Sequence, residues 1–176
     1  MRLFLAIDLQ EKVKKSLSKQ IDDLKKKYPD FSWVDEKNFH ITIHFFGEVK
    51  DIEKIQEKIK TAIYDQYHFY LYSYDLGMFV NHKITVYLGF RREKKLENLV
   101  NSIRDIFNID NPIKFVPHLT LARYRIPSKQ QYFVIKKNLS QQNIEIDFSV
   151  KKIILFQSIL SAKKPIYKKL ASFSLV

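Results

Sequence analysis

One short pattern occurs twice in this chain and constrains its fold more than any other feature. The segment Phe39-His40-Ile41-Thr42-Ile43 is matched by Pro117-His118-Leu119-Thr120-Leu121, a little under half the chain length further on. In each copy a histidine and a threonine alternate with apolar residues, and a helix-like segment follows a short distance later. A duplicated half-domain, with its two copies related by a pseudo-twofold axis, accounts for this repeat.

The alternation in both copies is typical of a β-strand, in which side chains point in turn to opposite faces of the sheet. His40 and Thr42 then share one face of their strand, and His118 and Thr120 share one face of theirs. The opposite face is apolar, with Ile41, Ile43 and Phe45 on the first strand and Leu119 and Leu121 on the second. If a pseudo-twofold axis relates the strands, the two polar faces meet across one cleft.

Helix and strand signals alternate along the rest of the chain and favour an α/β or α+β fold with helices packed on sheet faces. Helices are expected at 13–28, 52–63 and 96–107, with a weaker one after Ser128. Asp51 is a suitable N-cap for the second helix, and Asn111-Pro112 is expected to end the third. Strands are expected at 2–9, 39–49, 69–78, 83–90, 115–125, 144–150, 152–160 and 167–175.

Composition excludes several classes of protein. With 45% hydrophobic and 14% aromatic residues, the chain has the apolar mass that a packed core needs. It has no cysteine, which rules out disulfide scaffolds, thiolate zinc sites, iron–sulfur clusters and cysteine nucleophiles. Only 3 glycines and 5 prolines interrupt the chain, and no linker-like segment divides it, so a single domain over 1–176 is expected.

The chain is strongly basic, and its sequence favours a cytoplasmic location. The 31 Lys+Arg against 19 Asp+Glu leave a formal net charge of +12, which suits a polyanionic partner but also serves solubility. The first ten residues, MRLFLAIDLQ, lack the long apolar core and cleavage site of a signal peptide. No segment approaches the ~20 apolar residues of a membrane span. A soluble cytoplasmic protein with no membrane partner is therefore expected.

Two histidines and two threonines on one face suit phosphoryl transfer without a metal ion. In-line attack on a phosphodiester needs a base on one side of phosphorus and an acid on the other. Histidine, with an ordinary pKa of about 6.5, fills either role near neutral pH. Threonine hydroxyls donate to the non-bridging phosphate oxygens, where charge gathers in the transition state. A single copy would indicate only a half-exposed polar strand, whereas two copies in matching contexts favour a catalytic face.

The repeat and its flanks resemble the 2H phosphoesterase superfamily, and within it the RNA 2′,3′-cyclic phosphodiesterase family, also called 2′-5′ RNA ligases or LigT-like proteins. The two His-x-Ser/Thr-x motifs of that superfamily correspond to His40-Ile41-Thr42-Ile43 and His118-Leu119-Thr120-Leu121. The resemblance extends to residues 2–7, to Trp33 with 38–39, and to residues 46–49, 115–123 and 158–170. One departure is Lys164, which stands where the family commonly has glycine.

The resemblance implies a two-lobed, pseudo-twofold α+β fold with antiparallel sheets, helices on the outer faces and a central cleft. It also implies hydrolysis of a terminal 2′,3′-cyclic phosphate on RNA to a 2′-phosphomonoester, without metal or cofactor, and in some members reversible 2′-5′ ligation. His40 would be the proton donor and His118 the proton acceptor, although the residues themselves leave the swapped assignment open. Thr42 and Thr120 would bind the substrate. The implied partner is RNA with a cyclic phosphate end, transfer-RNA fragments included, and no protein partner is implied.

Arg123 also matches a family position and would help to hold the phosphate. Strict alternation places it on the strand face opposite His118 and Thr120. Arg123 reaches the polar face only if a bulge near Ala122 shifts the phase of the strand, or if the strand ends there. The alternative is a surface ion pair between Arg123 and a carboxylate.

Three further histidines are given no catalytic role. His44 follows His40 by four residues, so on a strand it shares the same face and is expected at the edge of the cleft or against the substrate. No carboxylate or cysteine nearby completes a ligand set, so no metal is expected. His68 and His82, at a strand start and a hairpin turn, are expected to be ordinary surface residues.

Two other functions are compatible with the sequence. The same cleft would serve a phosphodiesterase for a small cyclic or 2′-5′-linked nucleotide, although the positive charge favours a longer polyanion. A non-catalytic RNA-binding module would also keep the cleft, although both histidines and both threonines are intact. The sequence contains no P-loop, which argues against an ATP-dependent ligase.

Overall fold

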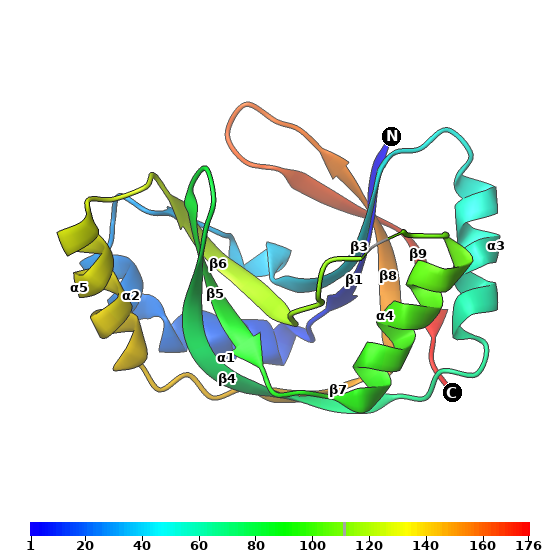
Figure 1. Ribbon diagram of the computed structural model, residues 1–176, viewed down its shortest axis with the longest axis horizontal. Helices are drawn as coiled ribbons and strands as arrows, with labels where there is room; N and C mark the ends of the chain where they lie inside the picture. Colours follow the sequence, from blue (N-terminus) through cyan, green and yellow to red (C-terminus); the bar gives the residue numbers. More distant parts are fainter. Residues whose placement is uncertain (111) are drawn as a thin grey trace.

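The computed structural model describes residues 1–110 and 112–176, and these residues build one antiparallel sheet (Figure 1). Within them, eight strands run across the sheet in the order β7-β4-β5-β6-β3-β1-β8-β9, and a short ninth, β2, pairs with β6. The strands are β1 (Arg2–Asp8), β2 (Ser32–Trp33), β3 (His40–Glu48), β4 (Phe69–Val80), β5 (Ile84–Phe90), β6 (His118–Tyr124), β7 (Asp147–Val150), β8 (Lys152–Ile159) and β9 (Ile166–Ser174). The expected α+β class is confirmed.

Five α-helices and one 3₁₀ turn lie in the described part of the chain. They are α1 (Glu11–Gln20), α2 (Asp22–Lys27), η1 (Glu36–Asn38), α3 (Ile52–Ile63), α4 (Lys94–Ile106) and α5 (Lys129–Ser140). As expected of an N-cap, the Asp51 side chain accepts a hydrogen bond from the backbone N–H of Lys54. Ser128 and Gln131 form a capping box that begins α5. No helix among these residues combines the length and apolar character needed to cross a membrane.

The segment 13–28 divides into two helices at Ile21, where one continuous helix is expected. The Gln20 side chain makes two hydrogen bonds with the backbone of Glu145, which ties the end of α1 to the segment before β7. Asp22 and Asp23 then lie in the first turn of α2, where the helix dipole favours acidic side chains. These contacts begin a second helix at the point where the first ends.

The helix α4 also ends earlier than the sequence suggests. Its last residue is Ile106, and Asn108 has a φ of 52°, a left-handed conformation that stops a helix. Asn111, which was expected to end this helix together with Pro112, lies outside the described residues.

The order of elements repeats, as the duplicated pattern predicts. The elements β1, α1–α2, β3 and α3 follow one another in the first half of the chain, and β5, α4, β6 and α5 follow one another in the second. β1 lies beside β3 as β5 lies beside β6, and β3 and β6 are neighbours at the middle of the sheet. In Figure 1, α3 and α4 lie together at one end of the molecule, and α2 and α5 lie at the other. The pseudo-twofold axis therefore passes between β3 and β6, the strands that carry the two motifs.

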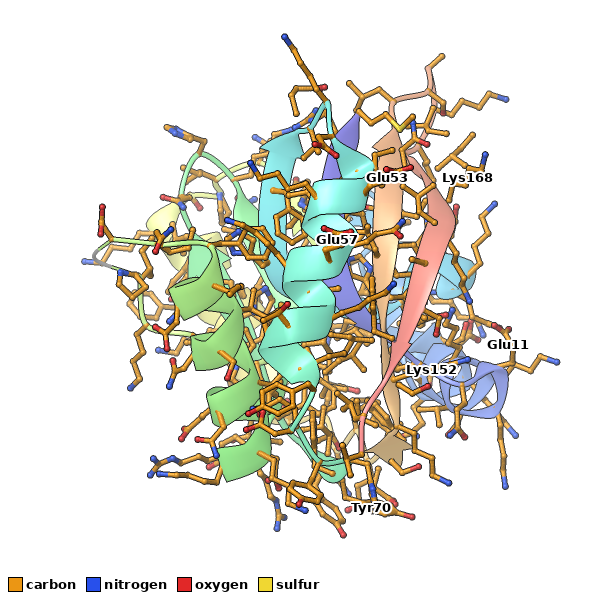
Figure 2. All side chains as sticks on the ribbon, turned by 90° about the vertical axis from the view of Figure 1, so that its right-hand side faces the viewer. Glu11, Glu53, Glu57, Tyr70, Lys152 and Lys168 are labelled. Atoms are coloured by element: carbon orange, nitrogen blue, oxygen red, sulfur yellow. The ribbon has the colours of Figure 1, made fainter. Side chains whose placement is uncertain are left out.

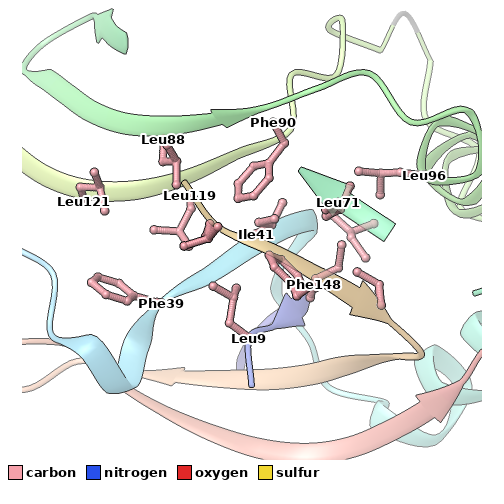
Figure 3. Packing of buried hydrophobic residues seen from close by; sticks show 14 of the residues in the cluster. Leu9, Phe39, Ile41, Leu71, Leu88, Phe90, Leu96, Leu119, Leu121 and Phe148 are labelled. Carbon is pink, nitrogen blue, oxygen red and sulfur yellow. The ribbon is translucent and has the colours of Figure 1, made fainter. Parts of the chain in front are cut away.

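A continuous apolar core fills the space between the sheet and its helices (Figure 3). Ile41, Leu88 and Leu119 are fully buried in it. Figure 2 shows Glu53 and Glu57 on the outer side of α3, which turns its apolar side to this core. A second, smaller cluster lies on the opposite face of the sheet and consists of Phe4, Ala6, Ile154 and Phe156, with Tyr167 packed against it.

Candidate active site

The two motif strands meet at the centre of the sheet through one antiparallel pair, Ile41 opposite Leu119. Both of these side chains are buried in the core, so their neighbours along each strand point to the other face, which we call the histidine face. The register sets His40 across from Thr120 and Thr42 across from His118. The two histidines are then diagonal neighbours, which in a regular antiparallel pair separates their Cβ atoms by roughly 7–8 Å. All four polar side chains are partly exposed on this face.

Both motif histidines are oriented in the same way. The Nδ1 atom of His40 lies 2.6 Å from the carbonyl oxygen of Asn38, and Nδ1 of His118 lies 2.7 Å from that of Val116. A carbonyl oxygen only accepts, so Nδ1 carries the hydrogen in each ring and donates it. In each ring Nε2 is consequently the nitrogen that this hydrogen bond leaves available for proton exchange, and the pseudo-symmetry of the fold extends to the two imidazoles.

His40 is held among three aromatic rings. Its ring centroid lies 5.1 Å from that of Phe4, 5.3 Å from Tyr167 and 6.4 Å from Phe156. Burial in this cluster is the largest influence on His40 and lowers its pKa below the ordinary histidine value. The guanidinium of Arg123 acts in the same direction. Arg123 belongs to the other half of the sheet, so side chains from both halves act on this one imidazole.

A buried lysine supports the turn that orients His40. Lys14 of α1 is only 2% exposed, and its Nζ lies 2.8 Å from Oδ1 of Asp8 and donates to the carbonyl oxygen of Lys37 at 3.1 Å. Lys37 precedes Asn38, whose carbonyl accepts from the imidazole. The ion pair of Lys14 and Asp8 therefore holds the 3₁₀ turn in place behind His40.

His118 packs against two aromatic rings from the β4–β5 hairpin. The ring centroids of Phe79 and Tyr87 lie 4.9 and 5.6 Å from that of His118, both near edge-on, and are stacked 4.1 Å from each other. Gly77 makes room for this arrangement, because a Cβ atom there would lie 2.6 Å from the Tyr87 ring. Any other residue at 77 would displace Tyr87 and with it the support of His118.

A bulge in β6 places Arg123 on the histidine face. The pairing of β5 with β6 skips one residue immediately before Ala122. As a result Thr120 and Arg123 both pair with residues of one β5 face, Tyr87 and Thr85. Arg123 is exposed there, and its influence on the pKa of the first motif histidine is consistent with this placement.

Two bulges in β3 give a different outcome for His44 and Phe45. In the pairing of β1 with β3, Ile43 and Phe46 have no partner in β1, so one bulge lies on each side of His44 and Phe45. His44 was expected on the histidine face, but its ring packs 4.8 Å from Phe46 and stacks 6.0 Å from Phe107 at the end of α4. Phe45 was expected on the apolar face, but its ring lies 5.8 Å from Phe4 and is 70% exposed. Both expectations are wrong, because strict alternation does not continue across a bulge.

Burial among these rings also lowers the pKa of His44, and the nearby positive charge of Arg104 lowers it further. The free energy of unfolding of the protein is therefore expected to depend on pH. A histidine with a lowered pKa in the folded protein binds fewer protons than in the unfolded chain as pH falls. Neutral His44 therefore costs the folded protein no stability above the ordinary histidine pKa. As the pH falls through and below that value, the unfolded chain binds the proton more readily and the free energy of unfolding decreases. We expect the melting temperature to fall from about pH 7.5 to about pH 5, and to fall less in His44→Gln.

Thermal unfolding followed by circular dichroism across this pH range checks the prediction. His82→Gln makes the same chemical change in the exposed β4–β5 turn and is the matched control. Equal pH dependence of the wild type and His44→Gln would contradict the assignment.

The remaining histidines lie on the surface, as expected. His68 is exposed just before β4, where its Nδ1 lies 2.9 Å from the carbonyl oxygen of Val176, and His82 is exposed in the β4–β5 turn. Within residues 1–110 and 112–176, no three His, Cys, Asp or Glu side chains gather closely enough to hold a metal ion.

Three neighbours of His40 were not anticipated as site residues. Tyr167 lies edge-on to His40, and burial raises the pKa of its phenol. Asp8 and Lys14 form the buried pair behind it. A signal for this pair exists in the sequence, because Lys14 falls in phase with the buried Leu17 of α1, at a helix position where a lysine is rare.

Comparison with known proteins agrees with the repeat and with the fold. A sequence model of the 2′-5′ RNA ligase superfamily matches residues 9–159. A Thermotoga maritima protein named RNA 2′,3′-cyclic phosphodiesterase is 32% identical over 97% of this chain and 93% of its own length. One of the same name from Archaeoglobus fulgidus is 29% identical over 98% of this chain and 99% of its own length.

Solved structures give the same result. The apo form of E. coli LigT is 26% identical, superimposes with a TM-score of 0.76, and covers 99% of this chain and 96% of its own. The superfamily match spans both motif strands, and the structural match spans almost the whole fold. The chain therefore belongs to the 2′-5′ RNA ligase superfamily, with the LigT-like 2H phosphoesterase fold.

Proposed function

We propose that the protein hydrolyses the 2′,3′-cyclic phosphate of RNA ends to a 2′-phosphomonoester and a free 3′-hydroxyl, without a metal ion, by acid–base catalysis between His40 and His118. One observation carries the proposal. Two matched imidazoles, each tied through Nδ1 to a carbonyl oxygen, share one sheet face as diagonal neighbours. That arrangement leaves their Nε2 atoms for proton transfer on either side of one phosphorus centre.

The step follows the roles that the family resemblance assigns. Nε2 of His118 takes a proton from water while the water oxygen bonds to phosphorus. The bond from phosphorus to O3′ breaks, and Nε2–H of His40 gives its proton to O3′. The pair returns to its starting protonation through solvent. With an RNA 5′-hydroxyl in place of water, the same proton transfers join two ends through a 2′-5′ linkage.

Names and ligands of relatives support this substrate class. Four relatives between 27% and 32% identical are named RNA 2′,3′-cyclic phosphodiesterase. E. coli LigT, 27% identical in both cases, has been solved with phosphate and with 3′-AMP. Both ligands contain a phosphate group, and 3′-AMP also contains the kind of nucleoside that bears the phosphate at an RNA end.

The hydroxyl groups of Thr42 and Thr120 donate hydrogen bonds to the non-bridging oxygens of the phosphate. Arg123 neutralises part of the negative charge on those oxygens. We expect Thr42→Ala and Thr120→Ala each to lower kcat by about 10–1000-fold, since each removes one donor to the transition state. Thr42→Ser and Thr120→Ser keep the hydroxyl and should retain most activity. Steady-state kinetics on an RNA cyclic phosphate measures this. A serine variant as slow as its alanine counterpart would show that the hydroxyl is not the active group.

The proposed reaction is tested with purified protein, EDTA and a short RNA that ends in a 2′,3′-cyclic phosphate. We expect a 2′-phosphate end, identified by its phosphorus NMR signal and by its resistance to an enzyme specific for 3′-phosphates. Tight RNA binding without turnover would instead support a non-catalytic module. A much higher kcat/KM on a small cyclic mononucleotide than on RNA would support the small-nucleotide phosphodiesterase.

A further inference from the structure

Lys169, near the end of the chain, carries its charge on the histidine face. It lies on β9 and pairs with Phe156 of β8, whose side chain belongs to the small apolar cluster on that face. Residues directly opposite each other on two strands share a face, so the side chain of Lys169 projects on the same side as His40. Tyr167, two residues before Lys169, agrees with this placement because its ring contacts that of His40.

An ion pair across the sheet fixes the position of this lysine. Its Nζ lies 2.6 Å from Oδ2 of Asp8, although Asp8 is on β1 and β8 lies between the two strands. Neighbouring strands are roughly 5 Å apart, so the lysine side chain extends inward over β8 to make this contact. The ion pair therefore directs the charge of Lys169 from the edge of the sheet toward the strand beside His40.

The carboxylate of Asp8 lies between two ammonium groups. It is 12% exposed, and its Oδ1 lies 2.8 Å from Nζ of Lys14, which is only 2% exposed. A buried ammonium needs a counter-charge, and Asp8 supplies it for Lys14. Glu11 also approaches Lys14, at 3.6 Å, but its side chain is 74% exposed and solvent screens its charge. The charge of Lys169 is thus largely left over for a ligand.

The position of this charge relative to the two histidines fits a second phosphate. Asp8 pairs with His40 across β1 and β3, so one carboxylate separates the Lys169 ammonium from the strand of the first motif histidine. The ammonium lies on the side of β3 away from β6, the strand of His118 and Arg123. It is therefore offset from the space between the histidines by one to two strand spacings, roughly 5–10 Å. Successive phosphates of an RNA chain are separated by a comparable distance.

We propose that Lys169 binds the phosphate that precedes the terminal nucleotide, and thereby favours an RNA chain over a mononucleotide. This inference rests on the proposed function and names a residue that sets its substrate preference. An ammonium group has three N–H donors, and the side chain of Lys169 is 61% exposed, so it binds a phosphate oxygen while it keeps its contact with Asp8. A nucleoside cyclic phosphate has no second phosphate for this contact. Lys169 takes no part in proton transfer.

Binding of two product-like probes tests this assignment apart from catalysis. One is the dinucleotide ApA with a 2′-phosphate on its 3′-terminal residue, and the other is adenosine 2′-phosphate. We expect Lys169→Ala to weaken binding of the dinucleotide by roughly 10-fold and to leave binding of the mononucleotide unchanged. Lys169→Arg keeps the charge and should retain dinucleotide binding. Lys168→Ala removes the neighbouring lysine, which pairs with Gln157 on the opposite face of β9, and is the matched control.

The salt dependence of binding is a second readout, which a purely structural role of Lys169 would leave unchanged. For the dinucleotide, the slope of log Kd against log salt concentration should decrease by roughly 0.7 in Lys169→Ala, because one phosphate contact is lost. In kinetics, Lys169→Ala should raise KM for ApA that ends in a 2′,3′-cyclic phosphate with little change in kcat. For adenosine 2′,3′-cyclic phosphate, wild type and variant should coincide.

Two results would overturn the inference. An equal loss of affinity for both probes would show that Lys169 acts on the terminal phosphate or on the site as a whole. Unchanged binding of both probes would limit Lys169 to its ion pair with Asp8. The proposed function fails separately: if the dinucleotide binds through Lys169 but its cyclic phosphate is not hydrolysed, the phosphate contact stands without the reaction.

Discussion

His118→Ala is expected to lower kcat for hydrolysis of an RNA 2′,3′-cyclic phosphate by about 10²–10⁴-fold, the usual contribution of one general base. The imidazole is oriented by the hydrogen bond from its Nδ1 to the Val116 carbonyl and by the rings of Phe79 and Tyr87, which leaves its Nε2 for proton transfer. Without it, water must lose its proton to solvent. KM should change little, because the phosphate remains bound by other groups.

Rapid-quench kinetics on the cyclic phosphate substrate measures this loss, and circular dichroism with thermal unfolding confirms that the variant is folded. His82→Ala removes an imidazole from the exposed β4–β5 turn and should keep full activity. The double variant His40→Ala/His118→Ala should be about as slow as the slower single variant, since the two act as one unit. Near-normal activity of His118→Ala would refute the two-histidine mechanism.

The convergence of the two motifs was predictable from the sequence because it needs only two local facts. Alternation fixes which side chains of each strand share a face, and the repeat requires the strands to be equivalent. His40, Thr42, His118 and Thr120 all lie before the first irregularity of their strands, so alternation places them correctly. Alternation therefore assigns side chains to the correct face of a strand up to its first bulge.

Beyond that point the sequence does not determine the face. A bulge is a mismatch in length between two paired strands, so it depends on the partner as much as on the bulged residues. A bulge near Ala122 was named only as one of two ways for Arg123 to reach the polar face, the other being that the strand ends there. Nothing comparable pointed to the bulges around His44 and Phe45, and both residues were assigned to the wrong side.

The supports of the two imidazoles are also a tertiary property. Phe79 and Tyr87 reach His118 from a hairpin, and Tyr167 reaches His40 from β9, near the end of the chain. Without the strand order, these rings cannot be distinguished from ordinary core or surface aromatic residues. No short sequence pattern predicts that β5 pairs with β6 or that β1 pairs with β8.

His40→Ala is expected to lose about 10²–10⁴-fold in kcat on the cyclic phosphate, but to lose little on a substrate whose leaving group needs no proton. In the proposed step His40 protonates O3′, an alkoxide that leaves poorly on its own. Burial among Phe4, Phe156 and Tyr167 lowers the pKa of His40, which makes its protonated form a stronger donor. A suitable probe is 3′-deoxyadenosine 2′-(4-nitrophenyl phosphate), from which water displaces nitrophenolate and leaves the 2′-phosphate.

On that probe the two histidine variants should separate. His40→Ala should approach the wild-type rate, because nitrophenolate departs as a stable anion, whereas His118→Ala should stay about 10²–10⁴-fold slow for want of a base. Release of nitrophenolate is followed by its absorbance, with the cyclic phosphate assayed in parallel on the same preparations. The opposite result, with His118→Ala restored and His40→Ala slow, would exchange the acid and base roles while keeping the pair. Restoration of neither variant would show that His40 contributes something other than protonation of the leaving group.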